Sequence, residues 1–272
     1  LSGKWRNTIN AATMLNQSKN CFQAEIDSAC ELIDFFNFNA SYAEDIYNKQ
    51  NLISPSGMKN SLEYRPLEGF VFAITPFNFT SIAGNLPTAP ALMGNVSIWK
   101  PASSALLACY YLMELLKEAG LPDGVINFLP GDGSTVGNPV LEHPSLAGVH
   151  FTGSTDTFNH IWKTIGANIN NYKTYPRIVG ETGGKDYCLA HESCDVDVLV
   201  TAMIRGAFEY QGQKCSAMSR AYIPSKIWPL INEKYISEVK TIKIGSPRNF
   251  SNFLNAVIDK SAFDTIAEYI DY

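Results

Sequence analysis

The sequence lacks the features that mark a nucleic-acid-binding or membrane protein. Its 272 residues contain no run of lysines or arginines and carry a net charge of -5. The sequence therefore indicates no basic patch that could bind nucleic acid or an anionic membrane surface. The longest apolar stretches, such as residues 105–116, fall short of the roughly 20 residues that span a bilayer. A small molecule is the expected partner.

The cysteines form neither a CxxC pair nor the dense spacing of a disulfide scaffold. The six of them lie at positions 21, 30, 109, 188, 194 and 215. This spacing predicts no zinc site, so no metal is expected, and it favours a reducing compartment. Internal repeats and low-complexity tracts are also absent from the sequence. A hydrophobic content of 46% is enough for one large or two medium domains with a buried core.

Hydrophobic periodicity predicts helices that alternate with buried strands. Apolar side chains spaced by three and four predict one long amphipathic helix over residues 21–47, with its apolar positions at Phe22, Ile26, Ala29, Leu32, Ile33, Phe36 and Ala40. Further along the chain, short apolar runs predict strands at 69–74, 96–99, 125–129 and 147–151. This alternation is typical of an α/β fold with a parallel sheet covered on both faces.

Helix caps and a glycine-rich boundary refine this pattern. Ser103 or Ser104 is expected to cap a helix that runs to Lys117 and stops at Gly120. A domain boundary is expected near residues 175–185, where a predicted strand ends in a glycine-bearing segment. After it, we expect a helix at 195–210, a strand at 221–223 and two amphipathic helices. These elements predict the start of a second domain.

Two glycine-containing turns are candidates for binding a nucleotide phosphate. Residues 131–137 approach the GxGxxG pattern, but the last spacing is one residue too long, so a plain strand-to-helix turn remains an equal alternative. Residues 151–154, Phe-Thr-Gly-Ser, precede a predicted helix whose N-terminal N–H groups attract anions. Taken singly, this segment is also compatible with a simple turn.

Three polar side chains are candidates for covalent catalysis. Cys215 lies in a polar loop beside Lys214, whose charge is expected to favour the reactive thiolate. Glu181 follows a strand in a glycine-bearing segment, which suits a general base. Asn78 also follows a strand and can donate a side-chain N–H to an oxyanion. In isolation each has a structural alternative: an inert core thiol for Cys215, a purely structural carboxylate for Glu181 and a turn former for Asn78.

Taken together, five segments resemble the aldehyde dehydrogenase superfamily, in the family's order and over essentially the whole chain. They are Pro76-Phe77-Asn78-Phe79, Trp99-Lys100-Pro101-Ala102-Ser103, Phe151-Thr152-Gly153-Ser154, Glu181-Thr182-Gly183-Gly184-Lys185 and Gly212-Gln213-Lys214-Cys215. Segments at 23–27, 31–36, 89–95, 208–210 and 214–217 are most similar to the Δ1-pyrroline-5-carboxylate dehydrogenases, which are also called glutamate-γ-semialdehyde dehydrogenases. The resemblance implies a Rossmann-like NAD-binding domain at 1–180, with part of an oligomerisation hairpin near 48–67. It also implies the truncated start of an α/β catalytic domain at 181–272.

The resemblance implies a role for each of these site residues. Cys215 attacks the aldehyde carbon, Asn78 and the Cys215 backbone N–H hold the oxyanion, and Glu181 activates the water that hydrolyses the thioester. Contacts with NAD are implied for Phe77, Lys100, Ser103, Gly153 and Ser154, and substrate contacts for Ser216, Phe79 and Glu31. Many relatives carry glutamate at the position of Ser103, so NADP is less firmly excluded here, although NAD is expected. The presence of Glu181 argues against the acylating branch, which transfers the acyl group to coenzyme A.

The expected activity is oxidation of L-glutamate γ-semialdehyde to L-glutamate in proline catabolism. The resemblance implies a homo-oligomer, in the mitochondrial matrix of a eukaryote or in a bacterial cytoplasm. Two alternatives stay open: an aldehyde dehydrogenase for another semialdehyde, such as succinate semialdehyde, and a catalytically silent binding or structural relative. The chain begins with Leu1, and the family's Glu-x-Phe-Gly-Pro motif does not occur in it. We therefore expect a fragment that alone binds cofactor poorly or is inactive.

Overall fold

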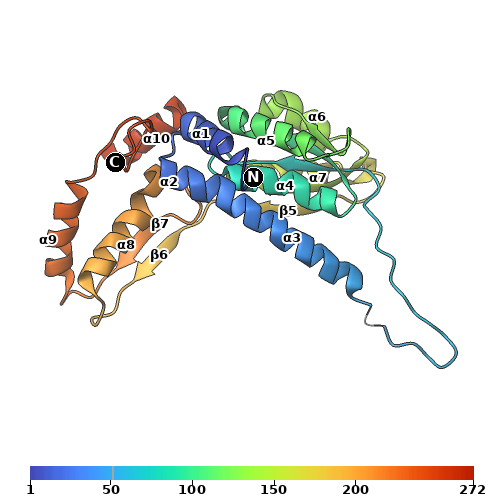
Figure 1. The fold of residues 1–272 in the computed structure, drawn as a ribbon, viewed down its shortest axis with the longest axis horizontal. Coiled ribbons are helices and arrows are strands. Elements are labelled where there is room, and N and C mark those ends of the chain that lie inside the picture. The colour runs from blue at the N-terminus through green and yellow to red at the C-terminus, as the bar shows by residue number, and fades with distance from the viewer. Residues whose placement is uncertain (51) are drawn as a thin grey trace.

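The computed structural model describes residues 1–50 and 52–272 and contains two parallel sheets (Figure 1). The larger sheet has the strand order β3-β2-β1-β4-β5, and the smaller sheet pairs β6 with β7. Their bounds are β1 (Phe70–Ile74), β2 (Val96–Lys100), β3 (Ile126–Phe128), β4 (Leu146–Thr152), β5 (Arg177–Glu181), β6 (Asp186–Leu189) and β7 (Met218–Tyr222). Every pair of neighbouring strands is parallel, which confirms the predicted α/β class.

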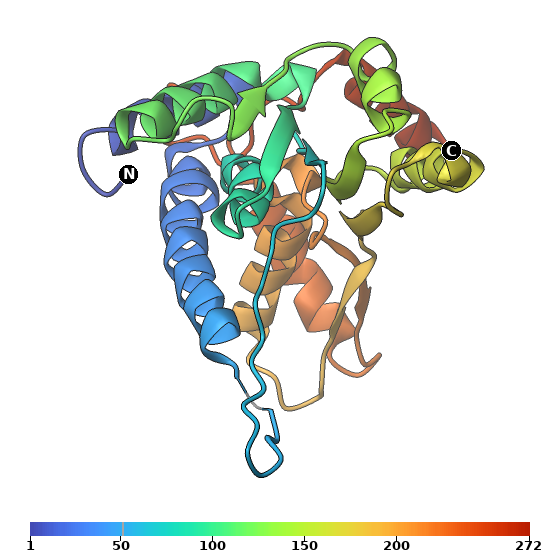
Figure 2. The same ribbon diagram turned by 90° about the vertical axis from the view of Figure 1, so that its right-hand side faces the viewer.

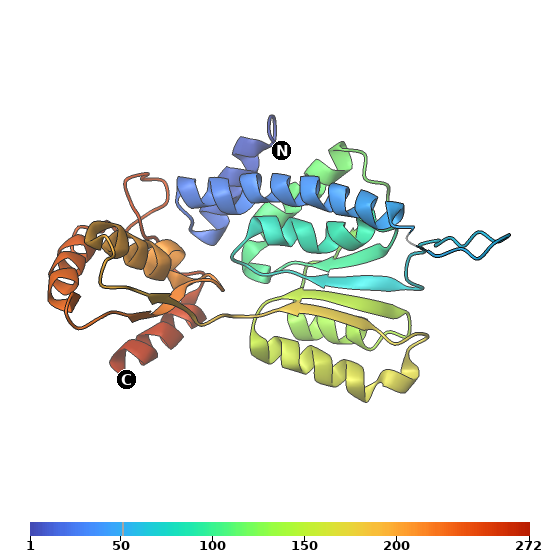
Figure 3. The ribbon, with the colours of Figure 1, turned by 90° about the horizontal axis from the view of Figure 1, so that it is seen from below.

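Helices cover both faces of the five-stranded sheet (Figure 3). On one side lie α1 (Arg6–Gln17), α3 (Glu31–Asn48), α4 (Thr80–Leu92) and α5 (Leu106–Glu118), and on the other α6 (Asn138–Leu141) and α7 (Thr155–Ala167). Trp99 and Leu112 are buried in the first core, and Phe72 and Phe151 in the second. β1 and β4 are mostly buried on both faces, and their sequences, FVFAI and LAGVHFT, are correspondingly rich in apolar residues.

The smaller sheet has its own helical cover. It packs with α8 (Val196–Phe208) and α9 (Trp228–Val239) around Leu199, Val200, Met203 and Ile231. The chain then reaches α10 (Lys260–Asp271), so the two predicted amphipathic helices are confirmed. Within the described part of the chain, no helix has the length and apolar character needed to cross a membrane.

The helix predicted over residues 21–47 is interrupted by a π-helical turn. α2 (Cys21–Ala24) leads into the π-helix η1 (Glu25–Cys30), which continues as α3. Three of the seven predicted apolar positions are exposed, Phe22 by 71%, Ile26 by 54% and also Ala40, so their placement on a buried face is wrong. The buried residues of this segment are Gln23, Ala24, Asp27, Ser28, Ala29, Leu32 and Ala43. A π-turn departs from the 3.6-residue period on which the prediction was based.

The start of α5 is capped by a side chain from another helix. Ser103 and Ser104 lie in the 3₁₀ turn η2 (Ser103–Ala105), and neither side chain caps α5, so that prediction is wrong. Asn16 of α1 takes this role, because its Oδ1 accepts from the Leu107 N–H at 2.9 Å and its Nδ2 donates to the Ser104 carbonyl at 2.9 Å. The predicted stop is confirmed, since Gly120 follows the helix with a φ of 95°.

The segment predicted to contribute to a subunit contact projects away from the sheets (Figure 2). Residue 51, which belongs to the range 48–67, lies outside the described residues. The Gln50 side chain makes two hydrogen bonds to the backbone of Leu62. Its Nε2 donates to the Leu62 carbonyl at 3.1 Å, and its Oε1 accepts from the Leu62 N–H at 2.8 Å. Ile53 and Met58 beyond it are 92% and 69% exposed.

Candidate active site

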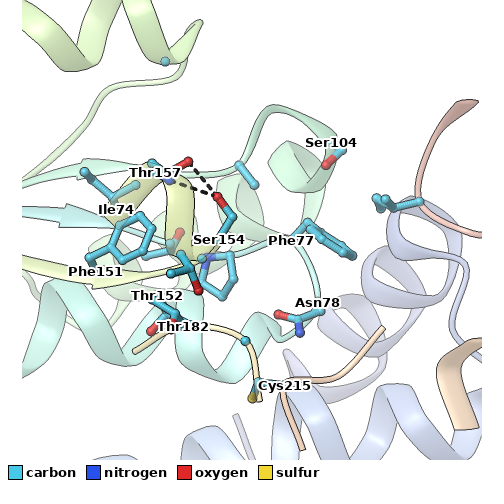
Figure 4. Close-up of a pocket in the computed structure, with 18 of the residues that line it drawn as sticks. Ile74, Phe77, Asn78, Ser104, Phe151, Thr152, Ser154, Thr157, Thr182 and Cys215 are labelled. Atoms are coloured by element: carbon cyan, nitrogen blue, oxygen red, sulfur yellow. Dashed lines mark hydrogen bonds between the residues drawn. The ribbon is translucent and has the colours of Figure 1, made fainter. Parts of the chain in front are cut away.

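A cleft opens at the carboxyl ends of β1 and β4. The chain leaves β1 toward β2 on one side, while β4 lies on the other side, so the loops after these two strands diverge. Parallel α/β sheets bind ligands at such a switch point. The cleft measures about 1400 Å³, more than the roughly 300–1,000 Å³ of a typical small-molecule site. Its lining includes six predicted site residues, Phe77, Asn78, Lys100, Gly153, Ser154 and Cys215 (Figure 4).

The loop that carries Cys215 has an unusual backbone conformation. In η5 (Glu209–Gly212), Tyr210 and Gln211 adopt left-handed φ angles of 52° and 56°. This region is costly for residues with large side chains, so other contacts must hold it. The Tyr210 hydroxyl donates to the Gln17 carbonyl at 2.8 Å, and Gln211 Nε2 donates to the Ala256 carbonyl at 2.7 Å. Segments from both ends of the chain therefore fix the loop.

The three predicted catalytic side chains converge at this loop. The Cys215 thiol donates to Glu181 Oε1 at 3.6 Å, at the end of β5. Asn78 Nδ2 donates to the Gln213 carbonyl at 2.9 Å, which leaves its second N–H available. A Cβ atom at Gly184 would lie 2.3 Å from the Cys215 carbonyl oxygen, so only glycine lets the chain after β5 approach Cys215 this closely.

The electrostatics of the thiol differ from the sequence prediction. Burial raises the pKa of Cys215, and the charge of Glu181 and its hydrogen bond raise it further. The backbone N–H groups of Ser216 and Cys215 act in the opposite direction. Lys214 was expected to favour the thiolate, but its Nζ lies 3.0 Å from Asp27 Oδ2 and 3.9 Å from Glu209 Oε2. That prediction is wrong, because the lysine charge is compensated by these carboxylates.

The other end of the cleft fits a nucleotide. Ser154 caps α7 by accepting from the Thr157 N–H at 3.2 Å, so the N-terminus of this helix faces the cleft (Figure 4). Lys100 is only 8% exposed and also lines the cleft. Burial lowers the pKa of Lys100, and its Nζ donates to the Pro101 carbonyl at 3.3 Å. Its remaining hydrogen-bonding capacity suits ribose hydroxyls or phosphate oxygens.

Four further predicted site residues, Ser103, Ser216, Phe79 and Glu31, are not among the residues that line the cleft. Ser103 donates to the Gly131 carbonyl at 3.3 Å, and Ser216 is exposed next to Cys215. Phe79 lies 5.5 Å from Lys214 Nζ, measured to its ring centroid. Glu31 accepts from the Ser81 hydroxyl, and burial raises the pKa of its carboxyl. Their binding roles stay predictions.

Sequence reasoning missed a buried ion pair behind the nucleophile. Lys19 is fully buried, and its Nζ lies 2.6 Å from Asp27 Oδ2. The expected amphipathic helix gave no reason to place Asp27 inside. Across residues 1–50 and 52–272, no cluster of three or more histidine, cysteine, aspartate or glutamate side chains is arranged to hold a metal ion.

Comparisons with known proteins match the whole chain. The model of the aldehyde dehydrogenase family matches residues 4–272. The chain is 53% identical to the mitochondrial delta-1-pyrroline-5-carboxylate dehydrogenase of Dictyostelium discoideum and 49% identical to that of Homo sapiens. Both alignments cover 100% of this chain. They cover 49% of the Dictyostelium protein and 48% of the human protein. The Mycobacterium tuberculosis delta-pyrroline-5-carboxylate dehydrogenase bound with NAD superposes with a TM-score of 0.97 at 55% identity, over 100% of this chain and 50% of that structure. The chain thus spans about half the length of these relatives. It belongs to the aldehyde dehydrogenase family.

Proposed function

We propose that the full gene product containing this chain oxidises L-glutamate γ-semialdehyde to L-glutamate with NAD. The observation that carries the proposal is the contact between the Cys215 thiol and Glu181 beside the cleft, with Asn78 bonded to the same loop. Relatives about half identical to the chain are named delta-1-pyrroline-5-carboxylate dehydrogenases, which supports this substrate. A related structure described as bound with NAD supports the cofactor.

The chemistry begins at Cys215. Its thiolate adds to the aldehyde carbon, and the thiol proton leaves through Glu181, the exposed carboxylate that the thiol already contacts. The carbonyl oxygen becomes an oxyanion that accepts hydrogen bonds from the free Asn78 N–H and the Cys215 backbone N–H. NAD bound in the cleft would supply the hydride acceptor that this oxidation requires. Glu181 then takes a proton from the water that attacks the thioester, which releases the acid and restores the thiol.

Cofactor and substrate contacts complete the proposal. We propose that Lys100, Ser103, Gly153, Ser154 and Phe77 bind NAD, because all but Ser103 line the cleft beside the N-terminus of α7. For the semialdehyde, we propose contacts with Ser216, Phe79 and Glu31. Residues 1–180 then form the NAD-binding domain and 181–272 the first part of the catalytic domain. Mitochondrial names among the eukaryotic relatives support a mitochondrial location if the source is a eukaryote, and we propose a homo-oligomer.

The test is NAD reduction by the full gene product with glutamate γ-semialdehyde. Succinate semialdehyde serves as the competing substrate, and Cys215→Ser as the variant. Preference for glutamate semialdehyde, abolished in the variant, is the expected result. Equal rates on both aldehydes would keep the chemistry but remove the substrate assignment. No reduction of NAD by the native protein would contradict the proposal and favour a silent relative.

A further inference from the structure

One carboxylate joins three segments directly behind the nucleophile. Asp27 Oδ2 lies 2.6 Å from Lys19 Nζ and 3.0 Å from Lys214 Nζ. Lys19 precedes α2, Asp27 belongs to η1, and Lys214 immediately precedes Cys215. The side chains of Lys19 and Asp27 are 0% and 4% exposed, and that of Lys214 is 15% exposed. This bridge therefore links the nucleophile loop to the helices that pack behind it.

Aromatic rings enclose the bridge. Lys19 Nζ lies 4.5 Å from the centroid of the Phe79 ring and 4.4 Å from that of Tyr210. Lys214 Nζ lies 5.5 Å from the same Phe79 ring. Ammonium groups at these distances are attracted by the ring faces, and the rings keep water out. With water excluded, the two ion pairs hold their geometry more firmly than surface pairs do.

The π-helical turn explains why Asp27 points inward. Asp27, Ser28 and Ala29 are three consecutive buried residues, at 3%, 0% and 0% exposure. The wider turn of η1 presents all three to the protein interior, between α2 and α3. Single π-turns within helices occur often at functional sites. Burying a carboxylate is costly unless it is paired, so the two lysines are what makes this position tolerable.

We propose that Asp27 is a positioning residue for the nucleophile loop: by bridging Lys19 and Lys214, it holds the backbone N–H groups of Cys215 and Ser216 against the thiol. The inference rests on the proposed role of Cys215. These two N–H groups favour the thiolate, and in the proposed reaction the N–H of Cys215 also binds the oxyanion. Lys19 supplies a second positive charge next to the buried carboxylate.

The rate of Cys215 alkylation by iodoacetamide tests this proposal, because it requires neither aldehyde nor cofactor. The rate is followed on the Cys215 peptide by mass spectrometry, from about pH 6 to about pH 10. Lys214→Met breaks the bridge on the loop side and leaves the pair of Lys19 and Asp27 intact. The double variant Lys19→Met/Asp27→Asn removes the buried pair, in which burial lowers the pKa of Lys19 to about 8, and breaks the bridge on the helix side. Lys226→Met/Glu192→Gln, which removes an exposed ion pair of 2.9 Å, is the matched control.

Both bridge variants should move the alkylation profile to higher pH, with a rate about threefold lower near pH 8, because the thiolate loses its fixed N–H partners. A triple variant that combines all three substitutions should show no further shift, because Lys214→Met and the double variant break the same bridge. Glu181, the other charged group facing the thiol, is unchanged in all variants.

An unmoved profile, a shift to lower pH or additive shifts would overturn the proposal. If the double variant fails to fold by circular dichroism, Lys214→Met alone decides. A bridge-dependent profile without any turnover would refute only the proposed function.

Discussion

At the scale of single residues, the contact between Cys215 and Glu181 favours a protonated resting thiol. A carboxylate that accepts from the thiol stabilises its neutral form, and its charge opposes a thiolate. In the proposed reaction, the same carboxylate receives the thiol proton. This arrangement limits the reactivity of the nucleophile when no substrate is present, because the thiolate rather than the thiol reacts with electrophiles.

Glu181→Gln should separate these two effects. Loss of the charge lowers the pKa of Cys215, so alkylation by iodoacetamide at neutral pH should become severalfold faster. Turnover should fall by about 10²–10⁴-fold, because the variant lacks the proposed general base. Both rates are measured on the same preparation, with the exposed Glu192→Gln as the control. Slower alkylation in the variant would show that Glu181 activates the thiol instead.

Gly184→Ala should displace the nucleophile. The added methyl group would meet the Cys215 carbonyl oxygen at 2.3 Å, so one of the two backbone segments must move. We expect a loss of about 1–3 kcal/mol in unfolding free energy, measured in urea, and a fall in turnover. Gly183→Ala is the matched control, because a Cβ atom there meets nothing within 4 Å. Equal effects of the two substitutions would contradict this account.

The residues found by sequence and those missed differ in a physical way. Cys215, Glu181 and Asn78 occur in motifs where residue type and local order indicate chemistry. The charge partner of Lys214 was not predictable, because Asp27 lies far away in sequence and reaches the loop only through packing of η1. Proximity in sequence suggested that Lys214 acts on the thiol, whereas the folded chain pairs it with carboxylates.

At the scale of elements, strands were easier to predict than helix faces. β1 and β4 are largely apolar, and burial on both sides of a parallel sheet leaves little ambiguity. The segment 21–47 gave the wrong face at Phe22 and Ile26, because a π-turn shifts the helical period. The cap of α5 was also missed, since Asn16 comes from a helix distant in sequence.

Asn16→Ala should destabilise the start of α5. The substitution removes the acceptor of the Leu107 N–H and the donor to the Ser104 carbonyl. The expected loss in unfolding free energy is about 1 kcal/mol, typical of an N-cap, and a urea titration measures it. Ser103→Ala should leave stability unchanged within about 0.5 kcal/mol, because its hydroxyl caps no helix. A larger effect at Ser103 than at Asn16 would restore the original sequence prediction.

At the scale of the whole molecule, buried charge links stability to pH. Burial lowers the pKa of Lys19 to about 8, whereas an unfolded lysine titrates near about 10.4. Between these values the unfolded state binds more protons, so this residue makes the unfolding free energy rise with pH. Lys19→Met lacks this contribution, and Asp27 keeps Lys214 as its partner.

The unfolding free energy of the native chain, relative to that of Lys19→Met, should therefore be lowest at and below about pH 8 and should increase toward about pH 10. The upper bound is about 1.4 kcal/mol for each pH unit in this window. Urea titrations at several pH values measure the difference, in which titrations common to both chains cancel. Lys226→Met, at a side chain 75% exposed, should give a difference that does not vary with pH. If the difference in unfolding free energy between the native chain and Lys19→Met did not vary with pH, Lys19 would remain charged up to about pH 10. The ion pair with Asp27 would then stabilise the charged lysine despite its burial.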